Sequence, residues 1–204
     1  MKSFDKIFFG FLIGFAFPFF LSLLSLLLWF FIDKNESRAL IYLSAGLLLG
    51  LMIDWKYLKN WVNKRYDLAI WFITLIYIIY NSVVYGFFMG FPVFNLFLGL
   101  VAGYYFGKRV CFRKLKSEMS SKIITQVSLF TGLIMTLICI SSGLIALLDN
   151  YTGSTIKGML GLSFEVTKEM ILTIIIIGGL SLIIAEYFIT RLVMQKTIKL
   201  NNNT

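Results

Sequence analysis

The chain has 204 residues, of which 59% are hydrophobic and 14% are charged. A soluble globular domain has about 45–50% apolar and about 25% charged residues, so this composition excludes a soluble fold. The net charge of +9 matches the basic excess that membrane proteins carry in their inner loops, so we expect no nucleic-acid partner.

The sequence also limits the chemistry that the protein can perform. It contains no His, which removes imidazole as a zinc or haem ligand and as a proton carrier. The motifs of serine hydrolases, zinc proteases and nucleotide-binding loops are absent from it. Cys111 lies in a basic loop and Cys139 about 24 Å along the next apolar helix, so we expect no disulfide. We therefore predict no catalytic residue, metal or cofactor, and no enzyme activity.

The first apolar segment, residues 7–32, carries no charged residue and exceeds the roughly 20 residues that cross a bilayer core. It is too long for a signal peptide and is predicted to be a retained helix. Pro18 predicts a kink in it. The second apolar run has only 15 residues before Asp54, so a crossing over residues 39–58 must include this acid.

Residues 68–107 form an uncharged stretch of 40 residues. This length accommodates two crossings, over residues 67–86 and 91–108, with almost nothing left for a turn. The turn is predicted at Gly86–Pro92, because Gly and Pro are the only helix breakers in the stretch.

Two further apolar segments complete the chain. The segment at residues 123–148 is uncharged, whereas the last one, at residues 170–191, has 16 uncharged residues before Glu186 and must include that acid. The connection between them is the longest, and a short interfacial helix is predicted at residues 157–164.

The sequence thus predicts an all-α integral membrane bundle of six transmembrane helices in one domain, residues 1–204. The helices are expected at about 7–32, 39–58, 67–86, 91–108, 123–148 and 170–191. With the N-terminus inside, 15 of the 19 Lys and Arg residues lie in inner segments. This bias predicts that both termini are cytoplasmic and that the cell (plasma) membrane holds the protein.

Glycines spaced by four residues recur on two predicted helices. They are Gly46 and Gly50 on the second, and Gly99, Gly103 and Gly107 on the fourth. Small residues at this spacing let helix backbones approach closely, which predicts helix packing. A homodimer face or a pore lining is the alternative.

Asp54 and Glu186 are the acids inside apolar segments, and each lies about 22–24 Å from the outer end of its helix. An acid at this depth is costly and often functional. One interpretation is that each pairs with a nearby base, such as Lys56 or Arg191. The other is that the two acids share a proton or cation site.

Asn81 and Asn95 flank the predicted turn between the third and fourth crossings. They are candidates for a shared polar cavity, and the alternative is a pair of hydrogen bonds between helices.

The loop that follows the fourth crossing is a candidate site for anionic lipid, or else serves topology alone. Its basic residues are Lys108, Arg109, Arg113, Lys114 and Lys116.

These features favour a small transport-type protein or transporter subunit, with a path or pocket between its helices. The alternative is a non-catalytic scaffold, sensor or assembly component that acts through glycine-mediated contacts with a membrane-protein partner or a second copy. In size and number of helices the chain resembles the substrate-binding subunits of energy-coupling vitamin transporters. Gly10 and Gly14 stand where that group has an alanine pair, so family membership is not inferred.

Overall fold

The computed structural model describes residues 2–88, 90–161 and 163–202. The chain is 88% helical, and no strand occurs within these ranges, which confirms the all-α prediction. Five of the described helices are long and apolar enough to cross a membrane, judged by length and composition. The protein is therefore compatible with a multi-pass membrane protein, and the sixth predicted crossing falls on a shorter helix of 17 residues.

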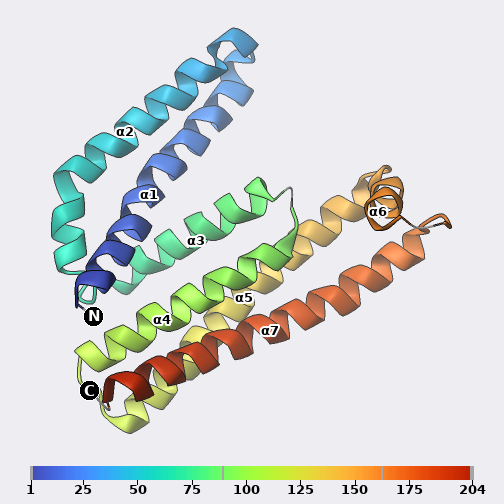
Figure 1. The fold of residues 1–204 in the computed structure, drawn as a ribbon. Helices are drawn as coiled ribbons and strands as arrows, with labels where there is room; N and C mark the ends of the chain where they lie inside the picture. The colour runs from blue at the N-terminus through green and yellow to red at the C-terminus, as the bar shows by residue number, and fades with distance from the viewer. Residues whose placement is uncertain (1, 89, 162, 203–204) are drawn as a thin grey trace. The chain divides into compact units, whose positions relative to one another are not determined.

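The chain forms two compact units, which we call unit 1 (Met1–Val83) and unit 2 (Val84–Thr204). The elements of unit 1 are α1 (Lys2–Leu28), the π-helical turn η1 (Trp29–Asp33), α2 (Glu36–Asn63) and most of α3 (Ile70–Phe87). Figure 1 shows α1 and α2 as an antiparallel pair. A core of Ile13, Ala16, Phe72 and Ile76 joins α1 to α3.

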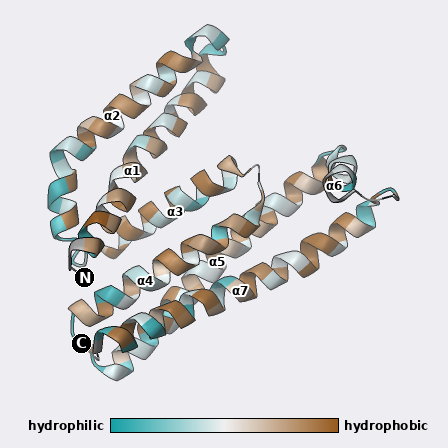
Figure 2. Ribbon diagram, in the orientation of Figure 1, coloured by the Kyte–Doolittle hydropathy of each residue, from teal (hydrophilic) through white to brown (hydrophobic). Residues whose placement is uncertain are grey.

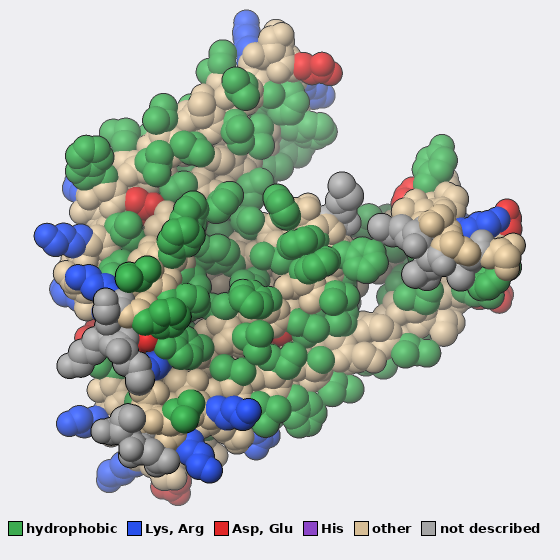
Figure 3. Space-filling model, in the orientation of Figure 1, with side chains coloured by type: hydrophobic (Ala, Val, Ile, Leu, Met, Phe, Trp, Pro, Cys, Tyr) green, Lys and Arg blue, Asp and Glu red, His purple; other side chains and the backbone are tan. Residues whose placement is uncertain are grey.

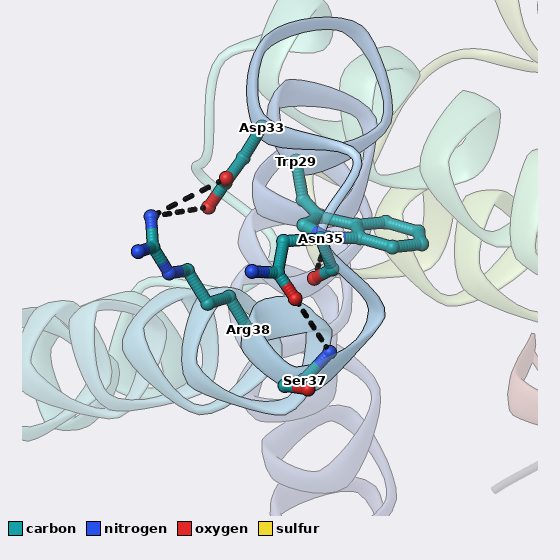
Figure 4. A network of polar contacts seen from close by, with 5 residues as sticks. All are labelled: Trp29, Asp33, Asn35, Ser37 and Arg38. Carbon is teal, nitrogen blue, oxygen red and sulfur yellow. Dashed lines mark hydrogen bonds and ion pairs between the residues drawn. The ribbon is translucent and has the colours of Figure 1, made fainter.

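Side chains around η1 fix the turn between α1 and α2 (Figure 4). The Trp29 indole donates a 2.8 Å hydrogen bond to the Asn35 carbonyl. The Asn35 side chain caps α2 by accepting a 3.1 Å bond from the Ser37 amide. Arg38 contacts Asp33 at 3.4 Å across the turn. These contacts join the end of one long apolar helix to the start of the next.

Unit 2 contains the 3-10 turn η2 (Pro92–Asn95), α4 (Leu96–Phe112), α5 (Ser117–Leu148), α6 (Thr152–Leu160) and α7 (Lys168–Asn202). The turn between the third and fourth helical segments lies where the sequence predicts it. Gly90 has a φ of 80°, which favours glycine, and Pro92 begins η2. Helices α4 and α5 both pack along α7.

The helices extend beyond the apolar segments of the sequence. Helix α2 continues to Asn63, α5 begins at Ser117, and α7 continues to Asn202. Hydropathy locates only the apolar part of a helix, and polar ends continue it wherever they still have a face to pack. In unit 2 such a face exists, because Val110, Val127 and Met194 form a buried cluster. The short connecting helix α6 begins before the predicted 157–164 segment.

Hydrophobic residues recur along the long helices, as the hydropathy colours of Figure 2 show. Many large hydrophobic side chains are exposed, including Trp55, which is 93% exposed. Figure 3 shows Lys and Arg side chains toward the ends of the helices, with hydrophobic side chains along their lengths. This distribution suits helices whose sides face lipid and whose ends face water.

Candidate functional site

The glycine row of α4 lies against α7. A methyl group built on Gly103 would lie 2.7 Å from the Thr190 carbonyl oxygen, and one on Gly107 would lie 2.7 Å from Cβ of Thr197. Both distances are too short for real contacts, so only glycine allows this approach. The later glycine on α4 faces the later threonine on α7, so residue numbers increase in the same direction along both helices. Helices α4 and α7 are therefore parallel. The row is therefore a helix-packing face within unit 2.

Glu186 occupies the same interface and is only 1% exposed. A methyl group on Gly99 would lie 2.7 Å from Cδ of the Glu186 carboxyl group. The acid therefore fits only because the facing residue has no side chain. Arg191, the base expected to pair with it, instead donates a 3.0 Å hydrogen bond to the Tyr187 hydroxyl.

Two buried threonines connect the three long helices of unit 2. The Thr131 hydroxyl on α5 donates a 3.0 Å hydrogen bond to the Thr190 hydroxyl on α7. Thr190 in turn donates a 3.3 Å bond to the Gly99 carbonyl on α4. Both threonines have no exposed surface. This chain of hydroxyls lies one helical turn from Glu186.

The two candidate asparagines are both buried. Asn95 ends η2 and precedes Gly99 by one turn, so it continues the face that carries Glu186. Asn81 belongs to unit 1, where its side-chain amide donates a 2.9 Å hydrogen bond to the Tyr77 carbonyl. The shared-cavity hypothesis for these two residues stays a prediction.

In unit 1 the glycines of α2 lie against α1. A methyl group on Gly50 would lie 2.6 Å from the nitrogen of Pro18, and one on Gly46 would lie 2.6 Å from the Ser25 hydroxyl. The later glycine on α2 faces the earlier residue on α1, as expected for an antiparallel pair. These glycines let the two backbones meet.

Asp54 lies one turn beyond Gly50 on α2 and is 6% exposed. Its Oδ2 would lie 4.0 Å from a methyl group built on Gly14 of α1. Its Oδ1 is buried and accepts no hydrogen bond from the residues described. Lys56, the expected partner, lies over the Tyr57 ring at 5.2 Å.

Tyr80 is a polar group of this region that sequence reasoning missed. Its hydroxyl donates a 2.7 Å hydrogen bond to the Leu12 carbonyl, which joins α3 to α1. The sequence has ten tyrosines, and nothing in its pattern distinguishes this one.

Another tyrosine, Tyr66, is buried and lies in the connection between α2 and α3. Its hydroxyl donates a 3.1 Å hydrogen bond to Asp5 at the start of α1. Burial, and secondly the negative charge of Asp5, raise the pKa of Tyr66 above its ordinary value. This contact joins the beginning of α1 to the end of α2.

Of the basic residues expected in the loop after the fourth crossing, Lys108 and Arg109 lie inside α4, which ends at Phe112. Lys108 and Arg109 are buried. The Lys108 ammonium donates to the Asn201 side chain at 3.0 Å, and Arg109 donates to the Tyr105 hydroxyl at 3.2 Å. Both residues therefore make contacts within the protein.

A cleft of about 710 Å³ opens beside this loop. Lys114 and Lys199 line it, together with serines at the start of α5: Ser117, Ser120 and Ser121. Of the five basic residues proposed to meet lipid, Lys114 lines this cleft, whereas Lys116 precedes the first turn of α5. Arg113 ends α4. Lys199 was not a candidate from the sequence, because it lies 85 residues away from Lys114.

Within the residues described, no three His, Cys, Asp or Glu side chains lie close enough to hold a metal ion. Cys111 and Cys139 are both free, as the sequence predicts.

No family model matches the chain, and no curated protein or solved structure shows a significant match to it. The site therefore has to be interpreted from its own geometry.

Proposed function

We propose that the protein is a multi-pass membrane protein of the transport type, in which Glu186 binds and releases a proton. The observation that carries this proposal is that Glu186 is 1% exposed and lies on Gly99. Ionisable residues within membrane helices are costly and mark ion or proton pathways. A proton needs no cavity of its own, so an acid this tightly enclosed suits a proton better than a larger solute.

The neighbouring hydroxyl groups support the same role. Thr131 and Thr190 form a hydrogen-bonded pair one turn from Glu186. Hydroxyl groups both donate and accept hydrogen bonds, so this pair places polar groups beside the acid in an otherwise apolar interior. Unit 2 thus combines a buried acid with a short polar connection across three helices.

The proposed topology has six crossings and two cytoplasmic termini in the cell membrane. Helix α4 alone is short, but η2 and α4 follow one another without interruption from Pro92 to Phe112. Together they are long enough to cross a bilayer core of about 30 Å. The concentration of 15 of the 19 Lys and Arg residues in the inner segments supports this orientation.

We also propose that anionic lipid head groups meet the protein at the cleft beside the basic loop. Lys114 and Lys199 supply positive charge there from two different segments. Clusters of basic residues beside membrane helices attract anionic lipids. Lys108 and Arg109 contribute less, because both are buried in contacts of their own.

The second candidate function is a non-catalytic scaffold that binds a membrane-protein partner or a second copy. One observation favours it: glycines on α4 and α2 meet backbone atoms of the facing helix, as at Gly103 and Gly50. Interfaces this tight suit a rigid component. In this function Glu186 would hold helices together and would move no proton.

Proton entry into liposomes distinguishes the two functions. The purified chain is reconstituted into vesicles that contain a pH-sensitive dye and K⁺, and valinomycin then creates an inside-negative potential. We expect faster acidification than in protein-free vesicles, and Glu186→Gln should abolish the difference. Glu118→Gln, at an exposed acid in the first turn of α5, is the matched control. Equal rates in wild type, Glu186→Gln and empty vesicles would favour the scaffold.

A further inference from the structure

The cleft beside the basic loop combines an apolar lining with exposed polar side chains. Its apolar lining residues belong to, or pack against, the buried cluster of unit 2: Val110, Leu115, Ile124 and Ile198. Four exposed side chains that donate hydrogen bonds also line it: Lys114, Lys199, Ser117 and Ser121. The volume of about 710 Å³ is typical of a pocket for a small ligand.

These four donors are not engaged elsewhere in the described part of the chain. No hydrogen bond or ion pair joins the side chains of Lys114, Lys199, Ser117 or Ser121 to another described residue. The hydroxyl of the neighbouring Ser120, by contrast, donates to the carbonyl of its own helix at Lys116. The lining residues include no Asp or Glu. The cleft therefore gathers two positive charges and two hydroxyl groups, with no negative charge among its lining residues.

The cleft lies at the depth of lipid head groups in the proposed topology. On α5 it extends from Ser117 to Ile124, a rise of about 10 Å along the helix. The uncharged run of this helix begins at residue 123. Head groups occupy roughly 5–8 Å on each side of the hydrocarbon core. Ile124 thus lies at the edge of the core, and Ser117 lies in the head-group layer.

The turn after α4 brings Lys114 to the cleft. The Lys114 amide donates a 3.1 Å hydrogen bond to the Cys111 carbonyl, and the Leu115 amide donates a 3.4 Å bond to the Val110 carbonyl. Lys114 has a φ of 49°, a left-handed conformation that favours glycine. Lys114→Gly therefore removes the ammonium group and suits the backbone at the same time.

We propose that this cleft binds a phosphate monoester, the group that forms the head of phosphatidic acid. The inference rests on the lipid site proposed above and names the chemistry of its ligand. A phosphate monoester carries about −1.5 to −2 charge at pH 7 and three acceptor oxygens. These match two ammonium groups and two hydroxyl groups. A phosphodiester carries one negative charge, so it would balance only one of the two lysines. The apolar lining favours a lipid over a soluble phosphate ester, which is the other source of the same group.

The test measures the thermal unfolding midpoint of the purified full chain in detergent that contains one added lipid at a fixed mole fraction. A ligand that binds only the folded state raises this midpoint by mass action. At pH 8 phosphatidic acid should raise it above the value in phosphatidylcholine, and by more than phosphatidylglycerol, a diester, does. Soluble glycerol 3-phosphate without added lipid distinguishes the sources. A rise as large as with phosphatidic acid would support the monoester and assign it to a soluble ester, whereas no rise would assign it to a lipid.

The pH gives a second measure of the same preference. At pH 5 a phosphate monoester holds one more proton than at pH 8, because its second pKa is about 6. The advantage of phosphatidic acid over phosphatidylglycerol should therefore shrink at pH 5. The titratable side chains that line the cleft are Lys114, Lys199 and Cys111. Phosphatidylglycerol reports any change in them, since its own charge is the same at both pH values.

Two variants assign the preference to the cleft. Lys114→Gly and Lys199→Gln should each reduce the advantage of phosphatidic acid over phosphatidylglycerol at pH 8. The control for the first is Lys34→Gly, because Lys34 has a similar φ of 54° and lies in the turn after η1. The control for the second is Lys122→Gln, at an exposed lysine of α5 that is not among the lining residues. Both controls should keep the preference.

Three results would overturn the proposal. Equal midpoints with phosphatidic acid and phosphatidylglycerol at pH 8 would reject the monoester but keep the proposed lipid site. A preference that persists unchanged in both Lys114→Gly and Lys199→Gln would mean that the phosphate binds outside the cleft. No rise with either anionic lipid would reject the proposed lipid site together with this inference. Proton entry through Glu186 depends on none of these results.

Discussion

The carboxyl group of Glu186 lies directly on the α-carbon of Gly99, in a space that any side chain on Gly99 would fill. The two positions are 87 residues apart in sequence and belong to the parallel helices α7 and α4. The pair combines two separate sequence signals, a glycine row and an acid in an apolar segment. The glycine is what allows the acid to be buried.

This relationship predicts a coupled mutant cycle. Gly99→Ala should displace the Glu186 carboxyl and destabilise the protein by on the order of 1–3 kcal/mol, the usual cost of overpacking. With Glu186→Ala already present, the same change should cost clearly less, because the obstructing atoms are gone. Chemical unfolding in detergent of the two single variants and the double variant measures the coupling. Additive losses would mean that the two residues do not share this space.

The next prediction concerns Gly103, whose added methyl would lie 2.7 Å from a backbone oxygen of α7. Backbone cannot move aside as a flexible side chain can, so Gly103→Ala should lower the unfolding midpoint. Gly178→Ala is the matched control, because nothing lies within 4 Å of a methyl group built there. It should be neutral or stabilising, since alanine favours helix. The measurement is the thermal unfolding midpoint of each variant in the same detergent. Equal midpoints would contradict the prediction that Gly103 packs against α7.

The threonine pair gives a third prediction. Thr131→Val and Thr190→Val each remove a buried hydroxyl of nearly the same shape. Hydrogen bonds between membrane helices average about 0.6 kcal/mol in double-mutant cycles, so we expect a coupling free energy of about that size. Thr136→Val is the control, because that hydroxyl bonds within its own helix, to the Gly132 carbonyl. A coupling of zero for the Thr131 and Thr190 pair would show that their hydrogen bond contributes nothing.

A fourth prediction follows from the raised pKa of Tyr66. Below pH 10 both folded and unfolded forms keep the proton, so this group's contribution to stability is complete. As the pH rises above about 10, the ordinary pKa of tyrosine, the unfolded chain loses the proton first and stability falls. The decline in unfolding free energy above this pH should be smaller in Tyr66→Phe. Tyr151→Phe, at an exposed tyrosine, should follow the wild type, and identical profiles for all three proteins would refute the prediction.

The last prediction concerns topology. In a variant without Cys111 and Cys139, a cysteine at Thr155, which is exposed in α6, should react with a membrane-impermeant thiol reagent added outside intact cells. A reporter fused after Thr204 should be active only in the cytoplasm. Both results follow from the distribution of basic residues. Labelling of position 155 only after the cells are opened would reverse the orientation.

Patterns within single segments predicted much of the fold. The uncharged runs located the long helices, and Gly90 and Pro92 stand in the turn that the sequence indicates. The lengths of α2, α5 and α7 were underestimated because a helix continues through charged and polar residues beyond its uncharged run. Hydropathy measures how favourably a residue transfers into lipid, so it does not show whether a helix continues into the polar residues beyond the membrane.

The candidate site was predictable in part. Glu186 and Asp54 were identifiable because an acid in an apolar run is conspicuous by itself. Tyr80 and Thr131 were not, because ordinary membrane helices contain many tyrosines and threonines. Their importance arises from partners at distant positions, such as the 59 residues that separate Thr131 from Thr190. A spacing rule for one helix cannot indicate such a partner.

The parallel pairing of α4 with α7 has a consequence for biosynthesis. Because α7 follows α4 with α5 and α6 between them, the glycine face of α4 stays uncovered until α7 has been made. During this interval a nascent chain would expose these glycines to other membrane helices. Chains that end before Glu186 would lack the residues that cover these glycines, so their α4 would stay open to contact with other helices.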